Sequence, residues 1–160
     1  MLIFLFTVAF CGMAESRVTD RLGIRDGLSN NFVTDIAQDG YGFLWIATDN
    51  GLNRFDGERF IVFDEKDKSL KGNSIDAIYY DDVAGYIWVG TKKGVNIIDC
   101  RTLRNVDLQI PAEIAGYGVA DFTPDGEGGI YLLGKYGFIA HFDRKQACWH
   151  IFREADFKGL

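Results

Sequence analysis

The sequence repeats itself at a fixed interval, and this repetition restricts the fold more than any other feature. The segment GFLWIATDNGLNRFDGERF at residues 42–60 is followed by GYIWVGTKKGVNIID at 85–99 and GGIYLLGKYGFIAHFD at 128–143. Each segment contains an apolar run, a polar turn with glycine and a second apolar run. Such a period is typical of repeat proteins, in which each unit buries its apolar faces against its neighbours.

Within each unit the pattern predicts β-strands. The aromatic residue of the first apolar run and the glycine of the turn both recur at steps of 43 residues: Trp45, Trp88 and Tyr131, and Gly51, Gly94 and Gly137. Each unit has four short apolar or β-branched runs separated by turn residues, and no helical periodicity competes with them. In the second unit the last run lies near 103–108. We therefore expect three four-stranded antiparallel meanders.

The packing of these meanders follows from their central runs. Unbroken apolar runs such as FLWIA at 43–47 predict strands that are covered on both faces. Meanders that pack face to face around an axis are the blades of a β-propeller. The expected fold class is therefore all-β, with three β-propeller blades. Since known propellers have about four to eight blades, three blades would form an incomplete ring.

The turn signals divide the chain into consecutive segments. We expect blade 1 at 31–72, blade 2 at 73–116, and blade 3 with the start of the next linker at 117–160. Residues 15–30 precede them and hold a short alternating run at 17–24. This run is expected to form one N-terminal strand that takes part in closing the ring, joined by a link to the first blade.

The first residues predict export. Residues 2–10, LIFLFTVAF, are uniformly apolar and are followed by the small residues Gly12 and Ala14. This pattern is typical of a secretory signal peptide over 1–14, and the apolar run is too short to span a bilayer. A positive charge normally precedes such a run and here does not, which leaves two alternatives, a translation start further upstream or a strand. The chain is therefore expected outside the cytoplasm.

The charge balance argues against one class of partner. The 160 residues carry 17 basic and 23 acidic side chains, for a formal net charge of −6. A chain of this charge repels a phosphate backbone and has no basic stripe to bind one. Nucleic-acid binding is therefore not expected.

No catalytic or metal-binding constellation is evident. His141 and His150 lie in neighbouring β-runs and could face each other across a hairpin, but no third metal ligand is evident. Asp81 and Asp82 could suggest glycoside hydrolysis, yet they are adjacent in a turn, where Asp is favoured for its backbone conformation. The glycine clusters lack the lysine and the following helix of a phosphate-binding loop. We expect no enzyme activity, no cofactor and no metal.

The two cysteines outside the leader are expected to be ordinary strand residues. The spacing of Cys100 and Cys148 matches no metal or redox motif. Export would permit a disulfide between them, so a bond remains the alternative.

Ligand contacts are expected in the turns rather than in the apolar runs. Trp45 and Trp88 could stack on sugars, but their place inside apolar runs favours packing between blades. The turns between the second and third strands emerge on one face of a propeller, together with the long linkers between blades. The candidate ligand-binding residues are those of the three turns, Asp49, Asn50, Lys92, Lys93, Lys135 and Tyr136.

Residues 26–60 resemble the repeat of the two-component regulator propeller family, which is written GLS-N-V, D-x-x-G-x-LW-IGT and GL-x-R-[FY]-DG. The resemblance extends over about 18–152 and is strongest in the first unit. In the third unit Tyr131 stands where tryptophan is expected, Leu133-Gly134 replaces Gly-Thr, and one residue is inserted before Asp143. The place of that unit rests on spacing more than on identity.

The resemblance implies a function. Such repeats form the periplasmic sensor region of hybrid two-component systems of gut Bacteroidetes, which detect glycan fragments. By this resemblance the chain is the N-terminal part of such a sensor, with an oligosaccharide or another extracellular ligand, the rest of the sensor chain and a second copy in a homodimer as its partners. The parent would be a histidine kinase anchored in the inner membrane. The alternative is a non-catalytic protein-interaction or structural propeller module.

Overall fold

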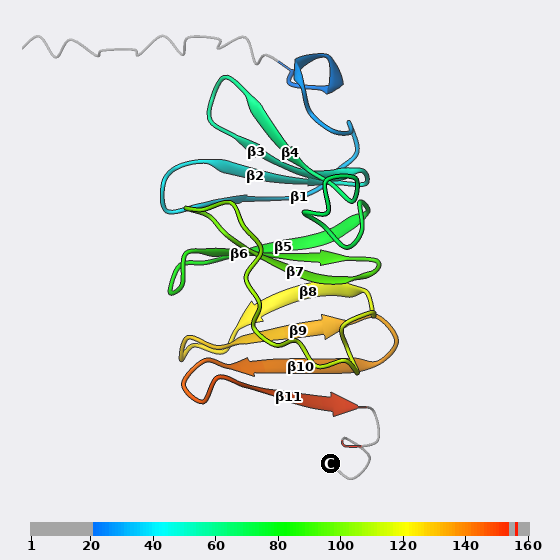
Figure 1. Ribbon diagram of the computed structural model, residues 1–160, viewed down its shortest axis with the longest axis vertical. Coiled ribbons are helices and arrows are strands. Elements are labelled where there is room, and N and C mark those ends of the chain that lie inside the picture. The colour runs from blue at the N-terminus through cyan, green and yellow to red at the C-terminus, as the bar shows by residue number, and fades with distance from the viewer. Residues whose placement is uncertain (1–20, 154–155, 157–160) are drawn as a thin grey trace, which may run out of the picture.

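The computed structural model describes residues 21–153 and residue 156, and within them the fold is all-β. Eleven strands form three antiparallel sheets, which are stacked along the long axis of the molecule (Figure 1). In each sheet neighbours in the sequence are neighbours in space, as expected for meanders. The predicted architecture of β-propeller blades is confirmed.

The strands follow the predicted apolar runs closely. The first sheet contains β1 (Val33–Gln38), β2 (Leu44–Thr48), β3 (Gly51–Phe55) and β4 (Phe60–Phe63). The second contains β5 (Ile75–Asp81), β6 (Tyr86–Thr91) and β7 (Gly94–Asp99). The third contains β8 (Val119–Pro124), β9 (Ile130–Gly134), β10 (Phe138–Asp143) and β11 (Cys148–Arg153). We refer to these sheets as blades 1, 2 and 3.

The second blade departs from the expected four strands. The run near 103–108 contributes one bridge, between Ile98 and Asn105, instead of a strand. Leu103 adopts a positive φ of 59°, and its amide bonds back to the carbonyl of Asp99, so the chain reverses tightly there. Two backbone hydrogen bonds still join the segment to β7, from the Asp99 amide to the Arg104 carbonyl at 3.0 Å and from the Val106 amide to the Ile97 carbonyl at 2.7 Å. The side chain of Asn105 also donates to the carbonyl of Ser69 at 2.8 Å, which ties the segment to the linker.

The N-terminal predictions fall largely on residues that the structure does not describe. The signal peptide at 1–14 lies outside the described residues, as does the first half of the strand expected at 17–24, and its second half, 21–24, forms no strand. Residues 21–23 carry no regular structure, and Ile24–Asp26 form a 3-10 helix, η1. This turn is closed locally, since the amide of Gly23 donates to the Asp26 carboxylate at 2.8 Å.

The blades are held together by two apolar layers. Trp45 and Trp88 are both 0% exposed, and each lies between its own blade and the next one, as predicted. The Trp88 ring packs against Phe122 and Phe142 of blade 3, with ring centroids 6.2 and 6.1 Å away. The buried aromatic rings on both sides of blade 2 stabilise the stack. Among the described residues, no disulfide and no group of potential metal ligands joins the blades.

The first strands of the three blades lie side by side, with β5 between β1 and β8. Each of them contains a bulge near its start, at the same place in the register. Just after the bulge of β5, the Ile78 amide donates to Asp35 Oδ2 of β1 at 2.9 Å. This bond joins the first strands of two blades directly.

Candidate functional site

The turns between the second and third strands of the blades lie along one edge of the stack, at the right in Figure 1. We call this surface the turn face and define it by residues 49–50, 92–93 and 135–137. All six predicted ligand-binding residues belong to it. Gly118 connects the turns of blades 2 and 3, because its carbonyl accepts the amide of Lys135 at 2.8 Å and it packs against Lys92.

The first turn is linked to the second blade by polar contacts. Asp49 Oδ1 accepts a hydrogen bond from the Ser74 hydroxyl and lies 3.8 Å from Lys92 Nζ. Asn50 Oδ1 accepts from the Asn73 amide at 3.2 Å. The side chains of Asp49 and Lys92 are about half exposed or more, so both can exchange these partners for a ligand.

The two other lysines of the turn face also lie next to carboxylates. Lys93 Nζ pairs with Glu65, and Lys135 Nζ lies 2.8 Å from Asp76 Oδ1. The second oxygen of Asp76, Oδ2, is buried and accepts no hydrogen bond. Each of the three lysines of the turn face therefore lies beside one carboxylate, which offers donors and acceptors without a strong net charge.

The turn of blade 3 is longer than the other two. Thr48 pairs with Gly51 and Thr91 with Gly94, which leaves two turn residues, whereas Gly134 pairs with Phe138 and leaves three. The residue inserted in the third unit therefore lies in this turn. Gly137 keeps the 43-residue step in the sequence, but it does not occupy the structural position of Gly51 and Gly94.

The longer turn presents an aromatic side chain to solvent. Tyr136 is 86% exposed and adopts a positive φ of 78°, a conformation that is strained for an aromatic residue. Its ring lies edge-on to that of Tyr117, with centroids 6.3 Å apart. Tyr117 in turn packs against Phe138 at 6.1 Å, so the exposed pair rests on the core of blade 3.

Three residues that contact the turn face were not predicted individually. Ser74, Asp76 and Tyr117 lie in or beside the linkers between blades, which were expected at this face only as segments. The signal for Tyr117 was its place at the end of a long linker, directly before the first strand of blade 3. Asp76 could not be identified, because nothing in the sequence places its carboxylate beside a lysine 59 residues further on.

The histidines face each other, which the sequence left open, but within the described residues no group of three potential ligands is placed to hold a metal ion. His141 pairs with His150 across β10 and β11, with ring centroids 6.1 Å apart. His141 Nε2 lies 2.8 Å from the Asp125 carboxylate. The backbone amide of Glu127 and this contact with His141 hold the pKa of Asp125 below its usual value.

The adjacent acids Asp81 and Asp82 do not act as a pair. Asp81 is buried, accepts the indole N–H of Trp88 at 3.3 Å and pairs with Arg144 of blade 3. Asp82 is exposed. The carboxylate of Asp81 therefore has a structural role. It closes the first turn of the blade.

Cys100 and Cys148 are both free. Cys100 is fully buried between blades 1 and 2, and burial raises its pKa to about 12. Cys148 is half-buried at the start of β11. A disulfide, the alternative considered for this pair, is not formed.

Comparison with known proteins connects this fold to sensor proteins. A family model described as the two component regulator propeller matches residues 27–50. The chain is 53% identical over 38 residues to Histidine kinase P4 of Formosa agariphila, a match that covers 24% of this chain and 3% of that protein.

Two crystal structures show the relationship in three dimensions. The extracellular domain of BT3049 from B. thetaiotaomicron, which is assigned to the hybrid two component systems, is 32% identical with a TM-score of 0.79 and covers 88% of this chain. The extracellular domain of BT4673 from the same organism, assigned to the same class, is 26% identical with a TM-score of 0.56 and covers 73% of this chain. The matches span 21% and 17% of those two structures, so the chain corresponds to about a fifth of their length.

Within the part of the chain that the structure describes, no helix has the length and apolarity needed to cross a bilayer. The sequence repeat, the stacking of the blades and the similarity to two extracellular domains all indicate the same kind of fold. The chain therefore carries the two-component regulator propeller repeat, in blades that are related to the extracellular domains of hybrid two-component systems.

Proposed function

We propose that this chain forms part of the periplasmic sensor domain of a hybrid two-component system, and that its turn face binds a carbohydrate ligand. The relatives support the first part, since two of them are extracellular domains of this class of system and a third is a histidine kinase. The apolar segment at 2–10 supports export. Phosphoryl transfer would belong to the rest of the sensor chain, anchored in the inner membrane, and the propeller itself would be non-catalytic.

The observation that carries the ligand proposal is the exposed pair of Tyr136 and Tyr117. An aromatic ring that is exposed to solvent on a strained backbone costs free energy unless it contacts a ligand or partner. The face of such a ring suits the apolar face of a sugar. Lys92 and Lys135 lie in the adjoining turns, with their carboxylate partners beside them. Paired donors and acceptors suit the hydroxyl groups of a sugar better than a phosphate, which would need an excess of positive charge.

A ligand on this face would contact more than one blade. A sugar stacked on Tyr136 and bonded to Lys92 would join blades 3 and 2, and binding would stabilise their relative placement by the free energy of association. We infer that this is how a ligand biases the sensor, with the change transmitted through the rest of the chain to the kinase and to its partner in a homodimer.

The experiment is a binding screen of the purified chain against neutral and uronic-acid oligosaccharides, followed by calorimetry on the best ligand. Tyr136→Ala is expected to weaken binding about tenfold or more, which corresponds to about 1.4 kcal/mol or more. Tyr41→Ala is the matched control, because Tyr41 is 59% exposed in the turn between β1 and β2, at the opposite end of the blade. Equal loss in both variants, or no loss in either, would contradict the proposal.

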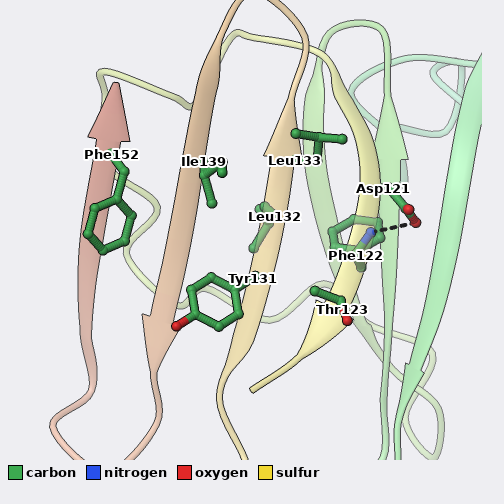
Figure 2. A pocket seen from close by; sticks show the side chains of 8 residues that line it. All are labelled: Asp121, Phe122, Thr123, Tyr131, Leu132, Leu133, Ile139 and Phe152. Atoms are coloured by element: carbon green, nitrogen blue, oxygen red, sulfur yellow. Dashed lines mark hydrogen bonds between the residues drawn. The ribbon is translucent and has the colours of Figure 1, made fainter. Parts of the chain in front are cut away.

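A second candidate function is a non-catalytic protein-interaction module. It is favoured by the apolar side chains that blades 1 and 3 expose, such as Ile36 at 57% exposure and Leu133, labelled in Figure 2, at 50% exposure. A screen in which no oligosaccharide binds, together with capture of a protein partner through these side chains, would favour this function over ligand sensing.

A further inference from the structure

Blade 2 has a groove along β7, in the space that the end of a fourth strand would fill. In blade 1, β4 pairs with β3 as far as Phe63, opposite Leu52. In blade 2 the chain leaves β7 after Val106 and runs towards blade 3 (Figure 1), where the Leu108 carbonyl accepts the indole N–H of Trp149 at 2.9 Å. The groove that remains has a volume of about 310 Å³. Three parts of the chain line it: β7 with Val95 and Ile97, the linker before β5 with Lys68 and Lys71, and the segment after β7 with Val106 and Ile110.

Lys71 reaches this groove from a position that blade 1 fills with a serine. The Lys71 amide donates to Asn96 Oδ1 at 2.9 Å, as the Ser29 amide donates to Asn53 Oδ1 at 2.8 Å. Asn53 and Asn96 hold the same place in their blades, because each is the third residue of the third strand. Ser29 and Lys71 are therefore equivalent in the fold, although their side chains differ in size and charge.

The two side chains also differ in their contacts. The Ser29 hydroxyl lies 2.9 Å from Thr48 Oγ1 and accepts the side-chain amide of Asn53 at 2.8 Å, so blade 1 satisfies it. Unlike the three lysines of the turn face, Lys71 forms no ion pair with a carboxylate in the described part of the chain. Burial lowers the pKa of Lys71, and the longer-range attraction of Asp107 opposes this effect. A partly desolvated ammonium without a counter-ion favours the binding of an anion.

The charges in the groove indicate which anion fits. Two lysines, Lys68 and Lys71, and one acid, Asp107, line it, so a ligand with a single negative charge is complementary and a zwitterion is less so. One oxygen of Asp107 accepts a local backbone amide at 2.8 Å, which leaves the other for a hydroxyl group. Apolar side chains such as Val106 and Ile110 complete the lining and suit one face of a sugar ring. The volume is at the small end of ligand sites and fits one sugar unit.

We propose that this groove binds a uronic-acid unit of an oligosaccharide, with Lys71 paired to its carboxylate and Asp107 accepting a hydroxyl group. The inference rests on the proposed carbohydrate ligand and names the charged unit of that ligand. The Lys71 side chain packs against Gly94, which directly follows the turn-face residues 92–93, so the groove adjoins the turn face. One oligosaccharide can therefore contact both.

The first experiment varies the ligand. The probes are the trimers of galacturonic acid and of glucuronic acid, and the tighter of the two is compared with its methyl ester, which keeps the rings and hydroxyl groups and lacks the negative charge. Calorimetry on the unmodified chain is expected to show about tenfold tighter binding of the acid, because hydrogen bonds to charged groups are stronger than those between neutral groups. Equal affinity of the acid and the ester, or no binding of either acid, would overturn the proposal.

The second experiment varies the protein. Lys71→Ser introduces the residue type of blade 1 and keeps the backbone bond to Asn96. Lys66→Ser is the matched control, because Lys66 is an exposed lysine of the same linker that does not line the groove. Lys71→Ser is expected to weaken binding of the acid about tenfold and to leave binding of the ester unchanged. Lys66→Ser should alter neither. Equal effects of the two substitutions on the acid would overturn the role of Lys71.

Tyr136→Ala separates this inference from the proposed function. Stacking on Tyr136 does not depend on the carboxylate, so this variant should weaken binding of the acid and of the ester by the same factor. If Tyr136→Ala weakens both and Lys71→Ser weakens neither, the groove proposal is wrong and the ligand site at the turn face stands. If Lys71→Ser weakens binding of the acid and Tyr136→Ala has no effect, the groove proposal stands and the role proposed for Tyr136 is wrong.

Discussion

The carboxylate of Asp39 accepts a hydrogen bond from the indole Nε1 of Trp45 at 2.9 Å, and both side chains are buried. Asp81 and Trp88 repeat this relationship in blade 2 at 3.3 Å. In both blades an acid at the first turn therefore satisfies the one polar atom of the tryptophan that packs between blades. The pair allows a large aromatic ring to be buried without an unpaired donor.

Loss of the Asp39 carboxylate is expected to destabilise the chain strongly. Asp39→Ala leaves the Trp45 N–H without an acceptor and leaves Arg54, whose Nε lies 3.7 Å from Asp39, without its counter-charge. Removal of one partner from a buried charged pair costs about 3–5 kcal/mol. Urea unfolding measures this loss. The control, Asp82→Ala, alters an exposed acid and is expected to change the free energy of unfolding by no more than about 0.5 kcal/mol. Equal stability of the two variants would contradict the structural role of Asp39.

A buried asparagine holds the linker in front of blade 2. Asn96 Oδ1 accepts the Lys71 amide at 2.9 Å, and its Nδ2 donates to the Ser69 carbonyl at 3.3 Å. Asn96→Ala is expected to cost about 1–3 kcal/mol, because the partly buried Lys71 amide loses its acceptor and the Ser69 carbonyl keeps only the bond from Asn105. Hydrogen exchange should show faster exchange at Lys71, with strand β9 of blade 3 unchanged as an internal control. An unchanged rate at Lys71 would mean that the linker is held by its apolar contacts alone.

Low pH is expected to destabilise the turns that contain Asp56 and Asp99. The backbone amides of Arg59 and Glu58 lower the pKa of Asp56 below its usual 3.8, and the amides of Thr102 and Arg101 do the same for Asp99. A carboxylate with a lowered folded pKa contributes stability that is complete above its unfolded pKa and is lost as the pH falls through the folded one. The free energy of unfolding should therefore be level above about pH 5 and should decrease below about pH 4.

This pH dependence can be assigned with one substitution. Asp56→Asn retains an acceptor for the two amides and cannot titrate. Urea midpoints at several acidic pH values should show a shallower decrease for Asp56→Asn than for the unmodified chain. Identical slopes would show that Asp56 does not contribute.

The cysteines are expected to differ in reactivity. Burial raises the pKa of the Cys100 thiol to about 12, so almost none of the reactive thiolate is present at neutral pH, whereas Cys148 is half-buried. In a Cys11→Ser background, a thiol reagent should label one thiol in the native protein and two after unfolding. Peptide mapping should place the native label on Cys148. Labelling of Cys100 at the same rate would mean that blades 1 and 2 separate readily.

The sequence predicts the blades well because local signals and the period agree. Apolar runs bounded by Gly-containing turns reproduce the strands within one or two residues, and the unbroken runs around Trp45 and Trp88 correctly predict burial between blades. The run near 103–108 fails to form a full strand because its pairing with β7 stops after one bridge, and Gln109 then takes a positive φ of 52°, which the sequence does not reveal.

The candidate site is predicted less completely. The turns are identified by their place in the repeat, and the structure brings them to one edge. The position of the inserted residue follows from strand pairing, which shows that Tyr136 belongs to an enlarged turn. Contacts such as Lys135 with Asp76, or Asp35 with the Ile78 amide, join different blades and depend on how the blades stack, which no local pattern contains.

The central claim is that the turn face binds the ligand, and its most direct test is a hydrogen-exchange footprint of the oligosaccharide selected in the screen. The amides of residues 49–51, 92–94 and 135–137 should exchange more slowly in the presence of the sugar, whereas those in the turn around Tyr41, at the opposite end of blade 1, should not change. Slower exchange around Tyr41 with no change in the three turns would contradict the claim.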